Sequence, residues 1–283
     1  GRSAAAGLPE LPGRGLTQAA LQLQVALPGP VRAILERAMP SQNGAAAPPL
    51  RLLPTLVREI DLFTAGQPAG RGGSGAPAGL PFGVEEHRLD TVWLDLFEGM
   101  PHLLVLGDGG CGKSSLLRLI AKGLAARYPP EEVALLVIDL RRGLLDLTSL
   151  PNLAGYACTP ATVAQAVGHL HRELPERTPA DLGLLANGTQ MPDRTQPTHV
   201  WPRRVVLVDD YDLLPAAAGS PLLPLLDLFG LGRELGLHLV LTRRVAGAAR
   251  AAFEPVFQRL RELGGSGLVM SGDPSEGPLL GNQ

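Results

Sequence analysis

The sequence predicts an α/β protein whose parallel sheet is covered by helices on both faces, together with an N-terminal extension. Three observations predict this fold. Continuous apolar runs of four to six residues alternate with helical segments after about residue 100, one such run leads through a glycine-rich turn into a helix, and another run ends in two aspartates. Strands buried on both faces lack polar alternation, so these runs are typical of parallel strands between helical layers.

Length and composition limit the class of protein. A chain of 283 residues fits one main domain of about 200 residues with something smaller beside it. The residues are 45% apolar and 18% charged, so the chain can bury a sizeable core. A net charge of −2 argues against a protein that binds nucleic acid through many phosphate contacts.

Other global features concern compartment and processing. Two cysteines, Cys111 and Cys158, make no disulfide framework and fit a reducing compartment. We predict no transmembrane helix in this piece of the chain. The chain begins with Gly1 and shows no signal-peptide pattern, so we expect a piece of a longer protein.

The first third of the chain is rich in alanine, glycine and proline, which favours linkers between short elements. We predict a short strand at residues 21–25, a short helix at 31–39 and a linker at 41–49. An extended or partly helical piece at 51–63, a mobile Gly/Pro/Ala linker at 65–81 and a second strand at 91–97 are predicted to follow. These boundaries divide the chain into residues 1–50, 51–80 and 81–283.

Beyond residue 100 the pattern becomes regular. Buried strands are predicted at residues 103–106, 133–138, 154–158, 205–208, 237–241 and 267–270. Helices are predicted at residues 113–127, 160–174, 221–236 and 251–263. Thr159 and Pro160 are typical of a helix start, and an apolar stripe follows at Val163, Val167, Leu170 and Leu174. Residues 175–202 are predicted to form a long polar loop.

The glycine-rich turn carries a phosphate-binding motif of the form G-x-x-x-x-G-K-[ST]. It reads Gly107-Asp108-Gly109-Gly110-Cys111-Gly112-Lys113-Ser114, and Ser115 follows in the helix. Glycines let backbone N–H groups turn inward around phosphates, and the helix N-terminus adds a positive end. The motif predicts that Lys113 reaches the β- and γ-phosphates of ATP and that Ser114 coordinates Mg²⁺. The alternative is a turn that is merely rich in glycine.

A P-loop needs a second carboxylate beside the metal, and Asp209 follows four apolar strand residues. We expect Asp209 to hold the water shell of Mg²⁺ and Asp210 to polarise the attacking water. Thr242 follows the next apolar strand, where it can sense the γ-phosphate. Two predicted strands separate the P-loop strand from Asp209 in the sequence, which favours the P-loop class (ASCE) with one strand inserted between them. The alternatives are turn-capping carboxylates and an ordinary strand-end threonine.

Several further polar residues remain open. Arg243 and Arg244 pair either with phosphate or a neighbouring subunit, or are simply solvated. Asp139 ends the second strand and precedes Arg141 and Arg142, which favours a local salt bridge. Cys111 is interpreted as a small filler of the loop. The pair His169-x-His171 is interpreted as helix surface, because no histidine spacing fits a metal site.

Several segments resemble the C-terminal ATPase module of the EccC family, the FtsK/SpoIIIE-type (FtsK/HerA-like) motors of the type VII (ESX) secretion system. They are the P-loop with its strand and residues 137–143, 208–213, 254–263 and 267–273, so that the resemblance covers roughly residues 80–281. Residues 12–28 look like the end of a preceding ATPase module, and residues 49–54 look like a connecting segment.

The resemblance implies a membrane-anchored chain with several tandem P-loop modules at the cytoplasmic face of the plasma membrane. It also implies hexamer-like assembly within a membrane secretion complex and recognition of small helical-hairpin secreted proteins through a C-terminal signal. It further leads us to expect one more strand beyond Gln283. The alternative function is a DNA-translocating FtsK-type ATPase, which the net charge of −2 disfavours because a DNA motor lines its pore with basic residues.

The sequence departs from FtsK-type motors at two places. These motors carry Glu after the first strand-end Asp, where this chain has Asp210, and a Thr-Gln-Arg-Pro segment where this chain has Thr242-Arg243-Arg244-Val245. We therefore expect weak ATP hydrolysis, with the protein acting either as a weakly hydrolysing motor module or as a recognition module with structural nucleotide.

A docking surface for the secreted partner is expected within residues 221–263. Residues 221–229 hold more apolar side chains than one buried helix face needs, and Phe253, Phe257 and Leu260 form a second stripe. Leu225 and Phe257 are the two contacts predicted there. The alternative for each is an ordinary core residue.

Overall fold

The computed structural model describes residues 57–58, 79–86, 89–177, 201–214, 219–248, 253–263 and 266–272, together with strands β1 (Arg14–Leu16) and β2 (Gln22–Gln24). The chain divides into two compact units, Gly1–Arg51 and Leu52–Gln283. In the first unit β1 and β2 pair antiparallel, which confirms the strand predicted at residues 21–25. The elements expected at 31–39, 41–49, most of 51–63, 65–78 and 178–200 lie outside the described residues. The division of the chain into three segments stays a prediction.

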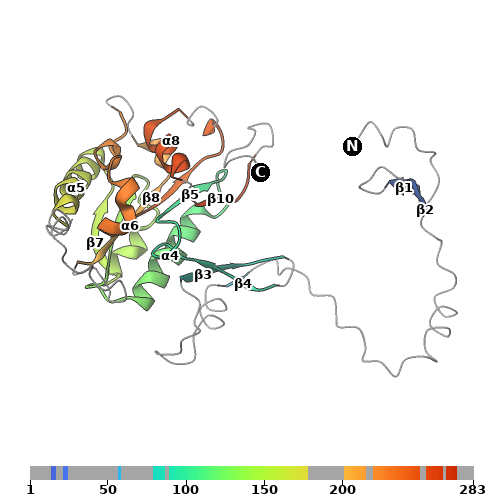
Figure 1. Cartoon of the computed structure of the whole chain (residues 1–283), viewed down its shortest axis with the longest axis horizontal. Helices are drawn as coiled ribbons and strands as arrows, with labels where there is room; N and C mark the ends of the chain where they lie inside the picture. The colour runs from blue at the N-terminus through green and yellow to red at the C-terminus, as the bar shows by residue number, and fades with distance from the viewer. Residues whose placement is uncertain are drawn as a thin grey trace, which may run out of the picture. The chain divides into compact units, whose positions relative to one another are not determined.

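The second unit contains a six-stranded parallel sheet (Figure 1). Its strands are β5 (His102–Leu106), β6 (Val133–Asp139), β7 (Leu153–Ala157), β8 (Arg203–Asp209), β9 (Leu237–Arg243) and β10 (Ser266–Val269). The spatial order is β10-β5-β9-β8-β6-β7, so β9 separates the P-loop strand β5 from β8. This confirms the class of P-loop fold that the strand spacing predicted.

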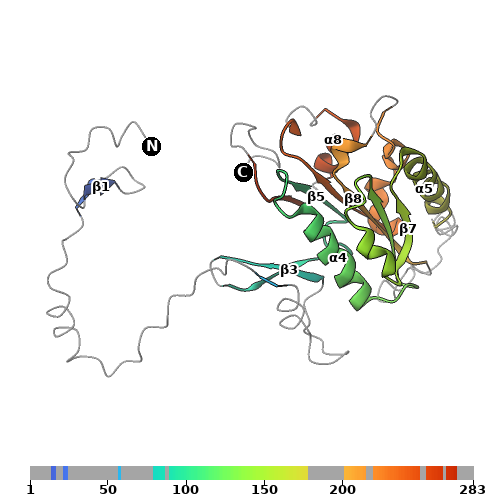
Figure 2. The same cartoon turned by 180° about the vertical axis from the view of Figure 1, so that it is seen from behind.

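Helices cover both faces of the sheet. Successive strand residues point to opposite sides, so each apolar strand has side chains to bury on both faces. On one face the side chains of Leu104 and Leu106 pack with those of α5 (Pro160–Glu173) and α8 (Pro255–Glu262). On the other face Leu103 and Val105 pack with α4 (Lys113–Arg127). Figure 2 shows the same layers from behind. The predicted helical layers on both faces are confirmed.

A β-hairpin packs against α4 and was only half predicted. β3 (Leu80–Val84) pairs antiparallel with β4 (Thr91–Leu94) and has a bulge between Pro81 and Gly83. The linker predicted through residue 81 is therefore wrong at its end, because Leu80 is buried in the core formed with α4. β4 ends before residue 97, because Asp95 accepts hydrogen bonds from two following backbone N–H groups and turns the chain.

The helix predicted over residues 221–236 is also wrong. This segment forms three short helical pieces, η7 (Leu223–Leu225), η8 (Phe229–Leu231) and α6 (Gly232–Leu235). Pro224 removes one backbone donor, and the glycine at 230 lies where a Cβ would approach the Arg259 guanidinium to 2.9 Å. Tertiary packing of Phe229 decides the local conformation instead.

The helix predicted over residues 251–263 begins later, as α8 at Pro255. Phe257 and Leu260 are 1% and 2% exposed, and Leu225 in η7 is fully buried. The two predicted docking contacts, Leu225 and Phe257, are therefore core residues. Phe253 precedes α8 and is 85% exposed. Within the described residues, no helix has the length and apolarity needed to cross a membrane.

The remaining short helical turns are η2 (Leu145–Ser149), η3 (Leu174–Arg177) and η6 (Tyr211–Leu213). η3 follows α5 directly, and its first residue, Leu174, is buried and completes the predicted apolar stripe of α5. η6 follows β8 directly and turns the chain at the edge of the sheet where the strand-end carboxylates lie.

Candidate functional site

The turn between β5 and α4 has the backbone conformation of an anion-binding loop. Gly110 and Gly112 have φ values of 79° and 105°, which side-chain-bearing residues rarely adopt. A Cβ at Gly109 or Gly110 would meet no described atom within 4 Å, so the loop faces open space. Gly112 is the N-cap of α4 and has no side chain to cap the helix, which leaves the first N–H groups of α4 directed at this space.

Lys113 lies folded over the loop that it closes. Its side chain is 6% exposed, and its Nζ donates hydrogen bonds to the carbonyl oxygens of Gly107 and Asp108 at 2.9 and 2.8 Å. The ammonium is thus held where a phosphate in the loop can exchange for these carbonyls. A cationic side chain, uncapped N–H groups and open glycines are a donor set that fits a nucleotide phosphate.

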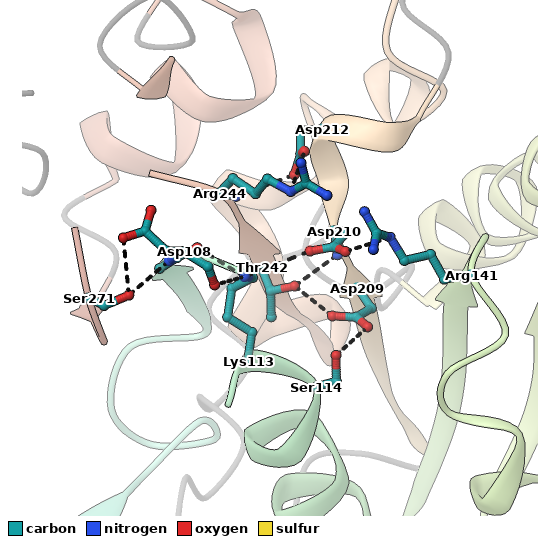
Figure 3. Close-up of polar contacts among 11 residues, drawn as sticks. Asp108, Lys113, Ser114, Arg141, Asp209, Asp210, Asp212, Thr242, Arg244 and Ser271 are labelled. Carbon is teal, nitrogen blue, oxygen red and sulfur yellow. Dashed lines mark hydrogen bonds and ion pairs between the residues drawn. The ribbon is translucent and has the colours of Figure 1, made fainter. Parts of the chain in front are cut away.

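A chain of short hydrogen bonds joins α4, β8 and β9 beside the loop (Figure 3). Ser114 Oγ donates to Asp209 Oδ2 at 2.7 Å, and Thr242 Oγ1 donates to Asp209 Oδ1 at 2.9 Å. Asp209 and Thr242 are 5% and 0% exposed. One hydroxyl and one carboxylate oxygen therefore lie together at the mouth of the loop, and oxygen ligands of this kind suit Mg²⁺.

Asp210 is positioned by its backbone as well as by its neighbours. Its φ and ψ are 48° and 62°, in the left-handed region, and its N–H donates to Thr242 Oγ1 at 2.9 Å. Its carboxylate lies 2.9 Å from Arg141 Nε and 3.9 Å from Lys113 Nζ. Burial raises the pKa of Asp210, and the nearby charge of Asp209 adds to this, whereas the two cations act in the opposite direction.

The structure therefore brings together six of the residues that the sequence singled out: Gly107, Lys113, Ser114, Asp209, Asp210 and Thr242. Ser115 is exposed on the first turn of α4. Cys111 is half-buried, and its sulfur fills the space beside Gly107, as expected for a small filler. Their roles toward a nucleotide stay predictions.

The local salt bridge expected at Asp139 is wrong. Asp139 is 1% exposed and accepts hydrogen bonds from the backbone N–H groups of Arg141 and Leu144 and from the Tyr156 hydroxyl. These bonds satisfy the carboxylate, so the Arg141 side chain is directed instead to Asp210. Burial and the bond to Asp139 raise the pKa of Tyr156.

Arg243 and Arg244 both form ion pairs within the chain. Arg243 is 8% exposed and its Nη1 lies 3.0 Å from Glu254 Oε1, so it is not a solvated arginine. Arg244 is half-exposed and lies 3.7 Å from Asp212. His169 and His171 are exposed on α5, as expected, and the described residues contain no cluster of three or more histidine, cysteine or acidic side chains suited to a metal.

Sequence reasoning did not place Arg141 or Ser271 in the site. Arg141 follows β6, and Ser271 follows β10. The Ser271 Oγ accepts a hydrogen bond from the Asp108 N–H at 2.9 Å. The Met270 methyl group lies where a Cβ on Gly112 would contact it at 3.3 Å. β6 and β10 are parallel neighbours of β8 and β5, so residues just after them reach the same edge of the sheet. That shared edge is the signal that could have identified them.

Comparison with known proteins now decides the family. The FtsK/SpoIIIE family matches residues 76–199. The ESX secretion system protein EccC of Thermomonospora curvata is 35% identical over 297 residues, which cover 99% of this chain and 21% of that relative. The ESX-4 secretion system protein EccC4 of Mycobacterium tuberculosis is 38% identical over 271 residues, covering 96% and 21%.

The chain belongs to the FtsK/SpoIIIE family of P-loop ATPases and is homologous to EccC proteins. It spans about a fifth of the length of these curated relatives. This family membership confirms the predicted resemblance and implies that the site binds a nucleotide, generally with Mg²⁺.

Solved structures agree with this assignment. The cytoplasmic domain of the T. curvata type VII secretion ATPase EccC matches with a TM-score of 0.71 and 34% identity, over all of this chain and 33% of that one. A structure of T. curvata EccC containing ATPases 2 and 3 in complex with a signal sequence peptide matches with a TM-score of 0.69 and 35% identity, over all of this chain and 50% of that one.

Proposed function

We propose that this chain is an ATP-binding module of a type VII secretion ATPase, which couples nucleotide binding to the recognition and export of small helical-hairpin proteins. The observation that carries the proposal is the Ser114–Asp209–Thr242 hydrogen-bond chain beside an open P-loop, in a chain homologous to EccC along nearly its whole length. A net charge of −2 gives no support to a DNA-translocating role.

Each residue of the site has a defined role in this proposal. Lys113 leaves the loop carbonyls and binds the β- and γ-phosphates of ATP, whose charge attracts it more strongly. Ser114 and Asp209 would hold Mg²⁺ and its water shell, and the ion would supply positive charge beside the phosphates. Thr242 fixes the orientation of Asp209 and reports on the γ-phosphate side of the pocket.

Asp210 polarises the attacking water, and we expect ATP hydrolysis at this site to be slow. A general base must lie within about 2.6 to 3.2 Å of the proton that it takes. Aspartate is one C–C bond, roughly 1.5 Å, shorter than the glutamate of FtsK-type motors. A misplacement of about 1 Å can cost on the order of a hundredfold in rate. The module is therefore proposed to be a weak ATPase.

The partners proposed are those that the resemblance to EccC implies. They are a secreted helical-hairpin substrate bound through its C-terminal signal, further ATPase modules, and a membrane secretion complex at the cytoplasmic face of the plasma membrane, with a hexamer as the assembled state. Binding of a signal sequence peptide by an EccC relative supports the first of these.

The docking surface is proposed to lie at Phe253 and the hollow beside it. Phe253 is 85% exposed, which is unusual for a phenylalanine and leaves its ring free for an apolar partner. The adjacent hollow of about 270 Å³ is lined by Tyr211, Arg243, Glu254 and Pro255, among others. A helical signal with an apolar anchor and flanking polar groups has the chemistry to fit this combination.

The test is capture of a helical-hairpin secretion substrate, and of a synthetic peptide with its C-terminal signal, in the presence and absence of Mg-ATP. We expect capture by the wild-type chain and at least about tenfold weaker binding by Phe253→Asp. Leu231→Asp is the matched control, because Leu231 is 51% exposed on η8 and lies outside the hollow. If Phe253→Asp binds the substrate and the peptide as tightly as Leu231→Asp does, the docking surface lies elsewhere.

A further inference from the structure

The contact between Arg141 and Asp210 joins the ends of two neighbouring strands. β6 and β8 pair in parallel, with Asp139 opposite Asp209, so the residues that follow them lie side by side. Arg141 Nε approaches Asp210 Oδ2 to 2.9 Å. Because Asp139 is satisfied by backbone and tyrosine donors, Asp210 is the carboxylate that this guanidinium pairs with.

The ion pair with Arg141 engages Asp210, the carboxylate that is proposed to polarise the attacking water. The Asp210 backbone is fixed by its hydrogen bond to Thr242, so only the side chain can change orientation. One carboxylate oxygen faces Arg141, and the other lies 3.9 Å from Lys113. A carboxylate with a cation beside each oxygen is held in one orientation.

We propose that Arg141 is a positioning residue that restrains Asp210 away from the attacking water and thereby keeps ATP turnover slow. The inference rests on the proposed function, because it concerns the rate of the reaction at the same site. When ATP is bound, Lys113 moves to the phosphates, and Arg141 is then the cation that still holds Asp210.

The exposure of the two partners makes the restraint reversible. The Arg141 side chain is 50% exposed and that of Asp210 is 13% exposed. An ion pair that is open to water on its cationic side is weak, so releasing it costs little. A buried pair of the same geometry would instead be a permanent part of the core. The low cost of release distinguishes a restraint on catalysis from a structural bridge.

The experiment compares steady-state ATP turnover at saturating Mg-ATP for three variants. Arg141→Gln removes the charge and keeps a side chain of similar polarity, Arg141→Lys keeps the charge, and Arg142→Gln removes an adjacent exposed arginine. We expect Arg141→Gln to raise kcat about fivefold, or about 1 kcal/mol, without a change in KM. Arg141→Lys and Arg142→Gln should remain near the wild-type rate.

A second pair of variants isolates the contact itself. In an Asp210→Asn background, Arg141→Gln should no longer raise turnover, because the restrained carboxylate is absent. An unchanged or lower kcat for Arg141→Gln would overturn the inference, and a lower one would assign Arg141 to phosphate binding. A fluorescent-nucleotide titration of each variant separates this failure from failure of the proposed function, which would appear as lack of ATP binding by the wild-type chain.

Discussion

Thr242 is the residue whose removal most directly tests the geometry of the site. Its hydroxyl donates to Asp209 Oδ1 and accepts from the Asp210 N–H, both at 2.9 Å, and the residue is fully buried. Thr242→Val keeps the shape of the side chain but removes both bonds. The change therefore leaves a buried carboxylate oxygen and a partly buried N–H without this partner.

The magnitude follows from the two bonds. A hydrogen bond to a charged group contributes about 1.5 to 3 kcal/mol, and an unsatisfied buried N–H costs about 1 to 3 kcal/mol. We expect a loss of about 3 kcal/mol in the free energy of unfolding. For a domain of this size that corresponds to a fall of about 6 to 12 °C in Tm.

The assay is thermal unfolding without nucleotide, followed by circular dichroism. Thr242→Ser keeps the hydroxyl and should lose only about 1 kcal/mol, from the missing methyl group. Thr148→Val removes an exposed hydroxyl that donates to Leu145 O, and should change stability by less than about 0.5 kcal/mol. If Thr242→Val unfolds at the same temperature as Thr148→Val, the hydrogen-bond chain does not stabilise the site as described.

Three further predictions concern other parts of the structure. Asp210→Glu should raise ATP turnover by about tenfold or more if reach limits the rate; an unchanged rate in a variant with normal ATP affinity would show that another group is missing. Burial opposes ionisation of Glu173, but bonds from Arg204 and Arg177 dominate and lower its pKa from 4.5. The stability that Glu173 contributes is therefore present above pH 4.5 and is lost as the pH falls through the lower pKa of Glu173 in the folded state. Glu173→Gln should consequently remove part of the fall in Tm between neutral pH and about pH 3. An identical fall in Tm for the wild type and the variant would contradict this. Phe257→Asp should fail to give a cooperative unfolding transition because it buries an unpaired charge, and a native-like melting curve would show that the residue is not in the core.

The elements best predicted from sequence are those whose causes are local. α4 was predicted at residues 113–127 and forms over Lys113–Arg127, because the glycine-rich loop and the following run of helix formers define its start and length. α5 begins at Pro160, where Thr159 and Thr162 form a capping box. The ends of the buried strands were predicted to within about two residues, because short continuous apolar runs are typical of strands that are buried on both faces.

The elements predicted wrongly depend on partners distant in sequence. Residues 221–236 have helical composition, but η7 and η8 are shaped by packing of Phe229 against the sheet, which the local pattern does not contain. For the same reason an apolar stripe could not distinguish a docking surface from core, and Phe257 is core. Only Phe253 in that stripe is exposed to solvent.

The candidate site was predicted in its residues but not in its contacts. The motif identified Lys113 and Ser114, and the strand pattern identified Asp209. The pairing of Arg141 with Asp210 depends on β6 lying next to β8, and this neighbourhood is a property of the sheet order. The sequence pattern predicted the strands and indicated one strand inserted beside the P-loop strand, but it did not place β6 next to β8.

The most direct test of the central claim is a calorimetric titration of Mg-ATP into the wild-type chain and two lysine variants. The chain contains two lysines, Lys113 and Lys122, and both lie in α4. We predict that Lys113→Ala weakens ATP binding by at least about tenfold, because it removes a charged donor to phosphate, and that Lys122→Ala binds as the wild type does. ATP affinity that is unaffected by Lys113→Ala, or absent from the folded wild-type chain, would contradict the assignment of the loop as a nucleotide site.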